Sequence, residues 1–83
     1  MLTVSVHSLK ETIFEGEAKS VIIPTSTGQI TVLENHIPLI SSLNRGKIII
    51  KRLVEKELEF KTESGFLEVK PKSRIIILIQ NER

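Results

Sequence analysis

The side chains that could carry out chemistry are few and widely separated. The chain has no Cys, which excludes disulfides, thiolate zinc sites and thiol nucleophiles. Its only imidazoles are His7 and His36, and nucleophilic catalysis needs a base near a hydroxyl and a group that orients the base. Glu34 and His36 could begin a metal site, but two ligands do not complete the shell that zinc requires. We therefore expect no catalytic residue, no metal and no cofactor.

Phosphate binding and acid–base chemistry are equally weakly supported. The four glycines are spread along the chain, so they do not form the glycine-rich loop that cradles a phosphate. Glu57 and Glu59 could be a carboxylate pair, but they alternate with Leu58 and Phe60. That alternation places both carboxylates on the solvent-exposed face of a strand, where solvated side chains are far commoner than catalytic ones.

Single-stranded nucleic acid is a minor alternative ligand. Small β-barrels that bind it stack bases on aromatic rings within basic grooves. This chain has three Phe, no Tyr and no Trp, and its net charge is only +2. Its basic residues around 45–52 are followed by Glu55, Glu57 and Glu59, which indicates cross-strand ion pairs within one hairpin. We expect no nucleic-acid partner.

The residues that must position any site are those of an all-β protein. Ile, Val and Thr make up 25 of 83 residues, against a single Ala, and β-branched side chains favour strands over helices. Runs of alternating or apolar residues predict strands over residues 2–7, 12–17, 19–23, 29–33, 39–43, 47–54, 58–62, 65–70 and 74–80. Pro24 is expected to end the third strand, and residues 25–28 read as a turn. The fold class is a small β-sandwich of about ten short, mostly antiparallel strands.

Two features of this pattern indicate a partner. Residues 20–44 contain one charged side chain, Glu34, although they include two loops. Loops lie on the surface, and charge depletion is typical of the centre of a protein–protein interface. Small polar residues could also solvate these loops unaided. Residues 75–79 are all apolar, so this strand is either buried on both faces or lends one face to a partner.

Several motifs in order carry a resemblance to a known family. The segment Gly28-Gln29-Ile30-Thr31-Val32-Leu33-Glu34-Asn35-His36-Ile37-Pro38-Leu39 is followed by Leu43, Gly46 and Ser64-Gly65-Phe66-Leu67-Glu68-Val69. Phe14 and Gly16 precede Val21-Ile22-Ile23-Pro24. Together these residues, over the whole chain, resemble the epsilon subunit of F-type ATP synthases. The resemblance implies a ten-stranded β-sandwich.

The resemblance also implies a function without catalysis. Such a subunit belongs to the central stalk and couples the gamma subunit to the c-ring during proton- or sodium-driven ATP synthesis. By this resemblance Thr27, Gly28 and Gln29 face the c-ring. The gamma-facing positions would be Ser8, His36, Pro38 and Ser41.

The implied location is peripheral. The subunit would be monomeric within its complex, on the cytoplasmic face of a bacterial inner membrane or the stromal face of a thylakoid. It would not insert into the membrane, and no run of the sequence approaches the ~18–20 apolar residues of a membrane span. A generic β-sandwich adaptor that uses the same uncharged loops on another partner is the alternative function.

Three features depart from the family pattern. Gln29 stands where many relatives carry an acid, so an ion pair to the c-ring cannot be assumed. Glu34-Asn35 stands where Pro-Gly or Pro-Asn usually precedes the His. The sequence ends at Asn81-Glu82-Arg83, so we expect one domain, residues 1–83, without the family's C-terminal helical hairpin. That absence would mean no inhibition of ATP hydrolysis and no nucleotide site.

Overall fold

Alternation of apolar and polar residues produces nine strands in residues 1–80, the part of the chain that the computed structural model describes. The expectation about the chain end at residues 81–83 lies outside this part. The strands are β1 (Leu2–His7), β2 (Thr12–Ala18), β3 (Ser20–Thr25), β4 (Gly28–Val32), β5 (Leu39–Leu43), β6 (Gly46–Lys51), β7 (Leu58–Thr62), β8 (Ser64–Lys70) and β9 (Arg74–Gln80).

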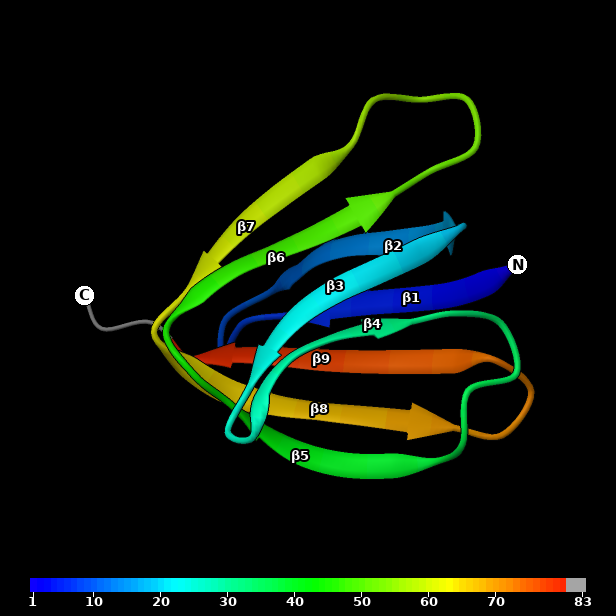
Figure 1. Ribbon diagram of the computed structural model, residues 1–83. Helices are drawn as coiled ribbons and strands as arrows, with labels where there is room; N and C mark the ends of the chain where they lie inside the picture. The colour runs from blue at the N-terminus through cyan, green and yellow to red at the C-terminus, as the bar shows by residue number, and fades with distance from the viewer. Residues whose placement is uncertain (81–83) are drawn as a thin grey trace.

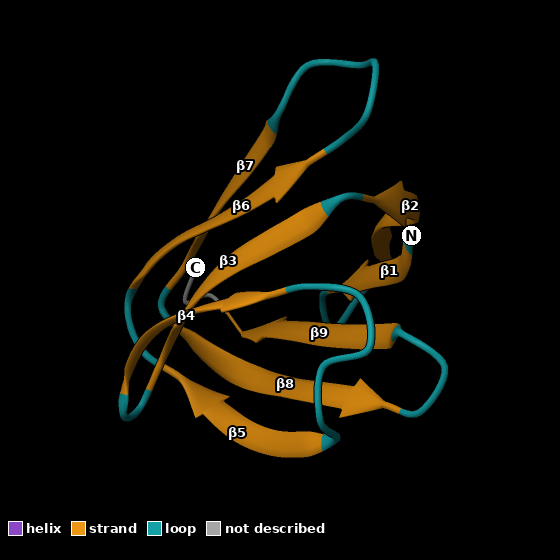
Figure 2. Cartoon of the chain, turned by 45° about the vertical axis from the view of Figure 1, so that its right-hand side comes forward, coloured by secondary structure: helices purple, strands orange, loops and turns teal. Residues whose placement is uncertain are grey.

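These strands form one sheet that folds over into two facing layers (Figures 1 and 2). One layer has the order β2-β1-β9-β8-β5, and the other has the order β4-β3-β6-β7. The layers join where Thr25 of β3 pairs with Leu43 of β5. Within residues 1–80 all strand pairs are antiparallel except β1 with β9, which is parallel. The all-β sandwich with mostly antiparallel strands is therefore confirmed, with nine strands in residues 1–80 where the resemblance implied ten.

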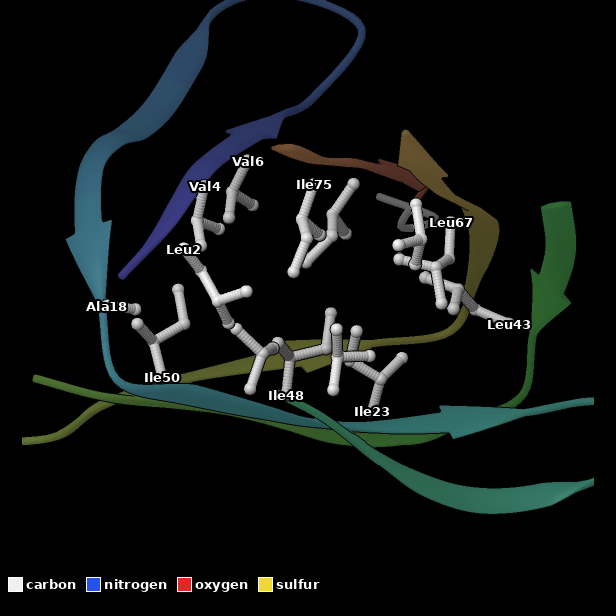
Figure 3. Close-up of a cluster of buried hydrophobic side chains, with 14 of the residues drawn as sticks. Leu2, Val4, Val6, Ala18, Ile23, Leu43, Ile48, Ile50, Leu67 and Ile75 are labelled. Atoms are coloured by element: carbon white, nitrogen blue, oxygen red, sulfur yellow. The ribbon is translucent and has the colours of Figure 1, made fainter. Parts of the chain in front are cut away.

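The core lies between the two layers, as Figure 3 shows. Each strand sends alternate side chains inward, because successive residues of a strand point to opposite faces. Val4, Ile48 and Leu67, for example, come from different strands and are fully buried. Leu58 and Phe60 are partly buried and pack against this core, which confirms the face predicted for β7. These contacts hold the layers at a fixed separation.

Pro24 does not end its strand, so this prediction was wrong. β3 continues to Thr25, and Pro24 pairs with Gln29 of β4. A proline removes only one N–H donor from a ladder. Its carbonyl oxygen still accepts a hydrogen bond, here from the backbone N–H of Asn44 at 2.9 Å. The strand therefore continues through the proline to the turn that precedes β4.

The sixth strand ends earlier than the apolar pattern predicts. β6 stops at Lys51, and Leu53 and Val54 lie in the β6–β7 loop with 65% and 90% of their surface exposed. Arg52 holds this loop, because its Nε–H donates to the carbonyl oxygen of Lys56 at 3.0 Å. The loop extends beyond the body of the sandwich (Figure 2). Apolar residues at a loop tip cannot be distinguished from strand residues by sequence pattern alone.

The turns gather at two opposite ends of the sandwich (Figure 1). The β1–β2, β3–β4 and β5–β6 turns lie at one end, which we call the β3–β4 end. The β4–β5 and β6–β7 loops and the β8–β9 turn lie at the other, which we call the β4–β5 end. Residues 1–80 hold no helix long and apolar enough to cross a bilayer.

Candidate interaction surfaces

The β3–β4 turn carries the three residues expected to face the c-ring. Thr27, Gly28 and Gln29 are all exposed. Gly28 has φ +123°, a backbone conformation that favours glycine. Beneath it the buried Thr25 hydroxyl donates to the carbonyl oxygen of Gly28 at 2.6 Å, and the N–H of Thr27 donates to the same hydroxyl at 3.3 Å. One buried threonine therefore shapes the turn and leaves its tip free for contact.

This turn is also bonded to the neighbouring strand and turn. The backbone N–H of Ser26 donates to the carbonyl oxygen of Ser42 in β5 at 3.0 Å. The N–H of Asn44, in the β5–β6 turn, donates to the carbonyl oxygen of Pro24 at 2.9 Å. A force applied to the tip would pass directly into β3 and β5. The β3–β4 turn is thus a rigid, uncharged projection.

The β4–β5 loop is anchored at both sides. The Glu34 carboxylate forms an ion pair with the N-terminal ammonium of Met1, with 3.0 Å between Oε1 and the nitrogen. Asn35 has φ +66°, and its N–H donates to the hydroxyl of the buried Ser73 at 3.0 Å. Asn is among the residues that adopt a left-handed backbone most readily. The loop therefore has a defined shape with Glu34-Asn35 where the resemblance implied Pro-Gly or Pro-Asn.

His36 bonds within its own loop. Its Nδ1–H donates to the carbonyl oxygen of Ile37 at 2.7 Å, since a carbonyl can only accept. Its backbone N–H donates to the carbonyl oxygen of Leu33 at 3.1 Å. The nearby Glu34 carboxylate is engaged by the N-terminus. Residues 1–80 contain no group of three potential metal ligands, so the Glu34–His36 pair is not extended into a metal site there.

The two serines expected to face gamma also bond locally. The Ser8 hydroxyl accepts hydrogen bonds from the N–H groups of Lys10 and Glu11, both at 3.2 Å, and shapes the β1–β2 turn. The Ser41 hydroxyl donates to the carbonyl oxygen of Ser42 at 3.0 Å. Both side chains are only partly exposed. Their first role is to fix the backbone around them.

The expected gamma-facing residues do not form one cluster. Ser8 follows β1 at the β3–β4 end, whereas His36 and Pro38 precede β5 at the opposite end. Ser41 lies between these ends, within β5 and opposite Leu67 of β8. A single partner could contact Ser8, His36 and Pro38 only by spanning the length of the layer, whereas the Ser41 side chain lies on the inner face with Leu67.

An apolar patch that was not predicted from the sequence lies in the middle of the β2-β1-β9-β8-β5 layer. On its outer face Phe66 of β8 lies opposite Leu78 of β9, and Ile40 of β5 is the diagonal neighbour of Phe66. Ile40 is 74% exposed and Phe66 is 53% exposed. Leu78 and Ile76 are half-buried beside them. Glu68 of β8, which is half-buried, lies between Ile40 and Ile76 on this face. We call Ile40, Phe66, Ile76 and Leu78 the outer apolar patch.

A signal for this patch was present in the sequence. The apolar run 75–79 was expected either to be buried on both faces or to lend one face to a partner. Ile75, Ile77 and Ile79 are buried, whereas Ile76 and Leu78 are half-buried on the outer face. Phe66 and Ile40 were not recognised, because their proximity depends on the registers of β8 with β5 and with β9. These registers are tertiary properties.

The basic residues of the hairpin are largely paired with its glutamates. Lys47 lies 3.8 Å from Glu59, and Lys51 lies 3.9 Å from Glu57. Arg45 donates through Nε to Glu63 at 2.9 Å. The cross-strand ion pairs predicted for β6 and β7 are therefore confirmed. This pairing weakens the alternative of a basic groove for nucleic acid.

A family model and several curated proteins match the chain. The model is described as ATP synthase, Delta/Epsilon chain, beta-sandwich domain, and it matches residues 1–82. The ATP synthase epsilon chain of Bordetella avium is 41% identical over 76 residues, which are 92% of this chain and 54% of that protein. The ATP synthase epsilon chain of Leptospira borgpetersenii is 39% identical over 69 residues, 83% of this chain and 54% of that protein. The chain thus spans about half the length of these relatives.

Solved structures share the fold. A chain in the cryo-EM structure of Euglena gracilis mitochondrial ATP synthase (OSCP/F1/c-ring) has a TM-score of 0.87, with 20% identity over 94% of this chain and 49% of that chain. A chain in the Tetrahymena thermophila mitochondrial ATP synthase central stalk/c-ring structure has a TM-score of 0.77, with 13% identity over 96% of this chain and 63% of that chain. At these identities the similarity concerns the fold alone.

Proposed function

The chain belongs to the ATP synthase delta/epsilon chain family, in its β-sandwich domain, and from this premise we propose that it is a non-catalytic central-stalk component that couples the gamma subunit to the c-ring. The observation that carries this proposal is the combination, on one rigid sandwich, of an exposed apolar patch and a rigid polar turn. A coupling protein needs two separate contact surfaces and a stiff body between them.

The outer apolar patch is proposed to bind gamma. A few well-packed, fully desolvated residues near the centre of an interface contribute most of its binding free energy. Phe66 and Ile40 are neighbours on the outer face and are more than half exposed in the isolated chain. A partner that covers this patch from end to end would also reach Ser8 and the loop that contains His36 and Pro38. Ser41 is opposite the buried Leu67, so its side chain lies on the inner face of β5, away from this patch.

The β3–β4 turn is proposed to contact the c-ring. Thr27, Gly28 and Gln29 are exposed and uncharged, so this contact would rest on hydrogen bonds and shape rather than on an ion pair. The turn lies at the end of the sandwich opposite the β4–β5 loop. The chain would then stand peripherally at the membrane, on the cytoplasmic face of a bacterium or the stromal face of a plastid, without entering the bilayer.

A binding measurement tests the gamma contact. Isothermal titration of the chain with the gamma subunit of its own organism should give a single-site complex. Replacing Ile40 and Phe66 together with Ser should weaken binding at least tenfold, because each central anchor contributes about 1 kcal/mol or more. The stability of the isolated variant should change by only about 0.5 kcal/mol per site.

The control is Val54→Ser, which removes an aliphatic residue that is 90% exposed but lies off the patch. It should bind gamma as the unaltered chain does. Full affinity in the Ile40→Ser, Phe66→Ser variant would show that gamma binds elsewhere. If the unaltered chain fails to bind gamma, the stalk role is rejected and a generic adaptor becomes the better function.

A further inference from the structure

A cleft separate from both proposed contact surfaces lies along β2. It has a volume of about 400 Å³ and runs between β2 and the β6–β7 loop. Phe14 of β2 and Leu53 of the loop contribute its apolar lining. Glu15 and Glu17 of β2 and Glu55 of the loop bring carboxylates to it. Two residues with cationic groups also line it: Arg52, whose Nε–H donates to the carbonyl oxygen of Lys56, and Met1, whose N-terminal ammonium pairs with Glu34.

The floor of this cleft is an open sheet edge. β2 is the last strand of its layer and pairs only with β1 among the strands of residues 1–80. An edge strand presents backbone N–H and C=O groups to which another strand can bond. A bulge at Ile13, which the register skips, limits the regular edge to residues 14–18. This stretch contains no Lys and no Pro, and its protection against unspecific pairing consists of the charges of Glu15 and Glu17 and the bulge at Ile13.

The charges at this edge indicate what would bind there. Glu15 lies opposite Ser5 and Glu17 opposite Thr3, so both carboxylates point to the outer face. A second copy of the chain pairing β2 with β2 would place these carboxylates opposite each other. Like charges directly across a pair of strands are destabilising. The charges therefore disfavour a second copy and favour a strand with basic side chains.

We propose that the β2 edge and its cleft bind an extended segment of another protein by strand addition, a segment in which basic and apolar residues alternate. Its basic side chains would lie beside Glu15 and Glu17 on the outer face. Its apolar side chains would enter the cleft beside Phe14 and Leu53. Period-two alternation in the segment matches these two environments, because successive side chains of a strand point to opposite faces. This site does not depend on the proposed contacts with gamma or the c-ring.

Peptide titration of the isotope-labelled chain, followed by NMR, tests the proposal. The probe is the blocked hexapeptide Lys-Val-Lys-Val-Lys-Val, and the matched peptide has Glu in place of Lys. The basic peptide should shift the backbone amide signals of residues 14–18 and bind at least tenfold more tightly than the acidic one. The Glu15→Gln, Glu17→Gln variant should lose most of this preference. The Glu57→Gln, Glu59→Gln variant, altered on the outer face of the other layer, should keep it.

Two further peptides separate strand addition from simple charge attraction. One is N-methylated at every Lys and the other at every Val, so each blocks one edge of the extended peptide. Strand addition uses one edge, and one of these peptides should therefore lose binding while the other retains it. Equal binding of both would overturn the proposal, as would shifts confined to other strands or equal losses in the two glutamine variants.

Discussion

Individual polar residues of this chain mainly fix the backbone of its turns. Ser8, Thr25 and His36 each bond to a backbone group within three residues. Their side chains are therefore already engaged, and a partner would meet surfaces of fixed shape. Ile40 and Phe66, by contrast, are apolar side chains with 74% and 53% of their surface exposed. At this scale, side-chain hydrogen bonds fix the shape of the turns, and exposed apolar side chains are the proposed source of binding free energy.

Two glycines should respond very differently to substitution by Ala. At Gly65, which is buried with φ +155°, a Cβ would overlap the carbonyl oxygen of Leu78 in the neighbouring strand. Gly65→Ala should cost about 3 kcal/mol or more of unfolding free energy. At Gly28 a Cβ would meet no atom within 4 Å, so only backbone strain remains, about 1–2 kcal/mol. Urea unfolding of both variants measures the difference, and equal losses would contradict it.

At the scale of single strands, most of the fold could be predicted from the sequence. Strict alternation identified β1, and alternation with Leu58 and Phe60 identified β7. The errors arose where tertiary contacts override local patterns. Pro24 stays in β3 because its carbonyl oxygen is bonded by the β5–β6 turn. Leu53 and Val54 lie in the β6–β7 loop and are exposed, because they do not pack against the core.

The β3–β4 turn should depend on one buried hydroxyl. Thr25→Val keeps the shape of the side chain but removes the 2.6 Å hydrogen bond to Gly28 and the acceptor for the Thr27 amide. We expect a loss of about 1–2 kcal/mol of stability and faster hydrogen exchange of the Thr27 amide. Thr31→Val, at an exposed position of β4, is the control. Unchanged exchange at Thr27 in Thr25→Val would show that the turn is held by its backbone bonds alone.

At the scale of the whole molecule, the candidate surfaces were only partly predictable. The uncharged β3–β4 turn and the β4–β5 loop were expected on the surface and are exposed. The outer apolar patch was not predicted, because it is assembled from β5, β8 and β9 through their register. Sequence spacing shows which residues share a face of one strand. It does not show which strands become neighbours.

The small core should leave little reserve of stability. A chain of this length is expected to have about 4–12 kcal/mol of unfolding free energy. Leu67 is fully buried between the layers, and Leu67→Ala should cost about 2–5 kcal/mol. We expect a large fall in the urea midpoint. A loss below 1 kcal/mol would indicate that the layers can close over the missing side chain.

The central claim is that this chain couples gamma to the c-ring, and ion pumping tests it most directly. Inverted membrane vesicles stripped of the catalytic complex are recombined with that complex, with or without the purified chain. The membrane potential generated per ATP hydrolysed is then measured with a potential-sensitive dye. We predict that the unaltered chain restores pumping and that the Ile40→Ser, Phe66→Ser variant does not. Full pumping without the chain, or equal pumping with both versions, would contradict the claim.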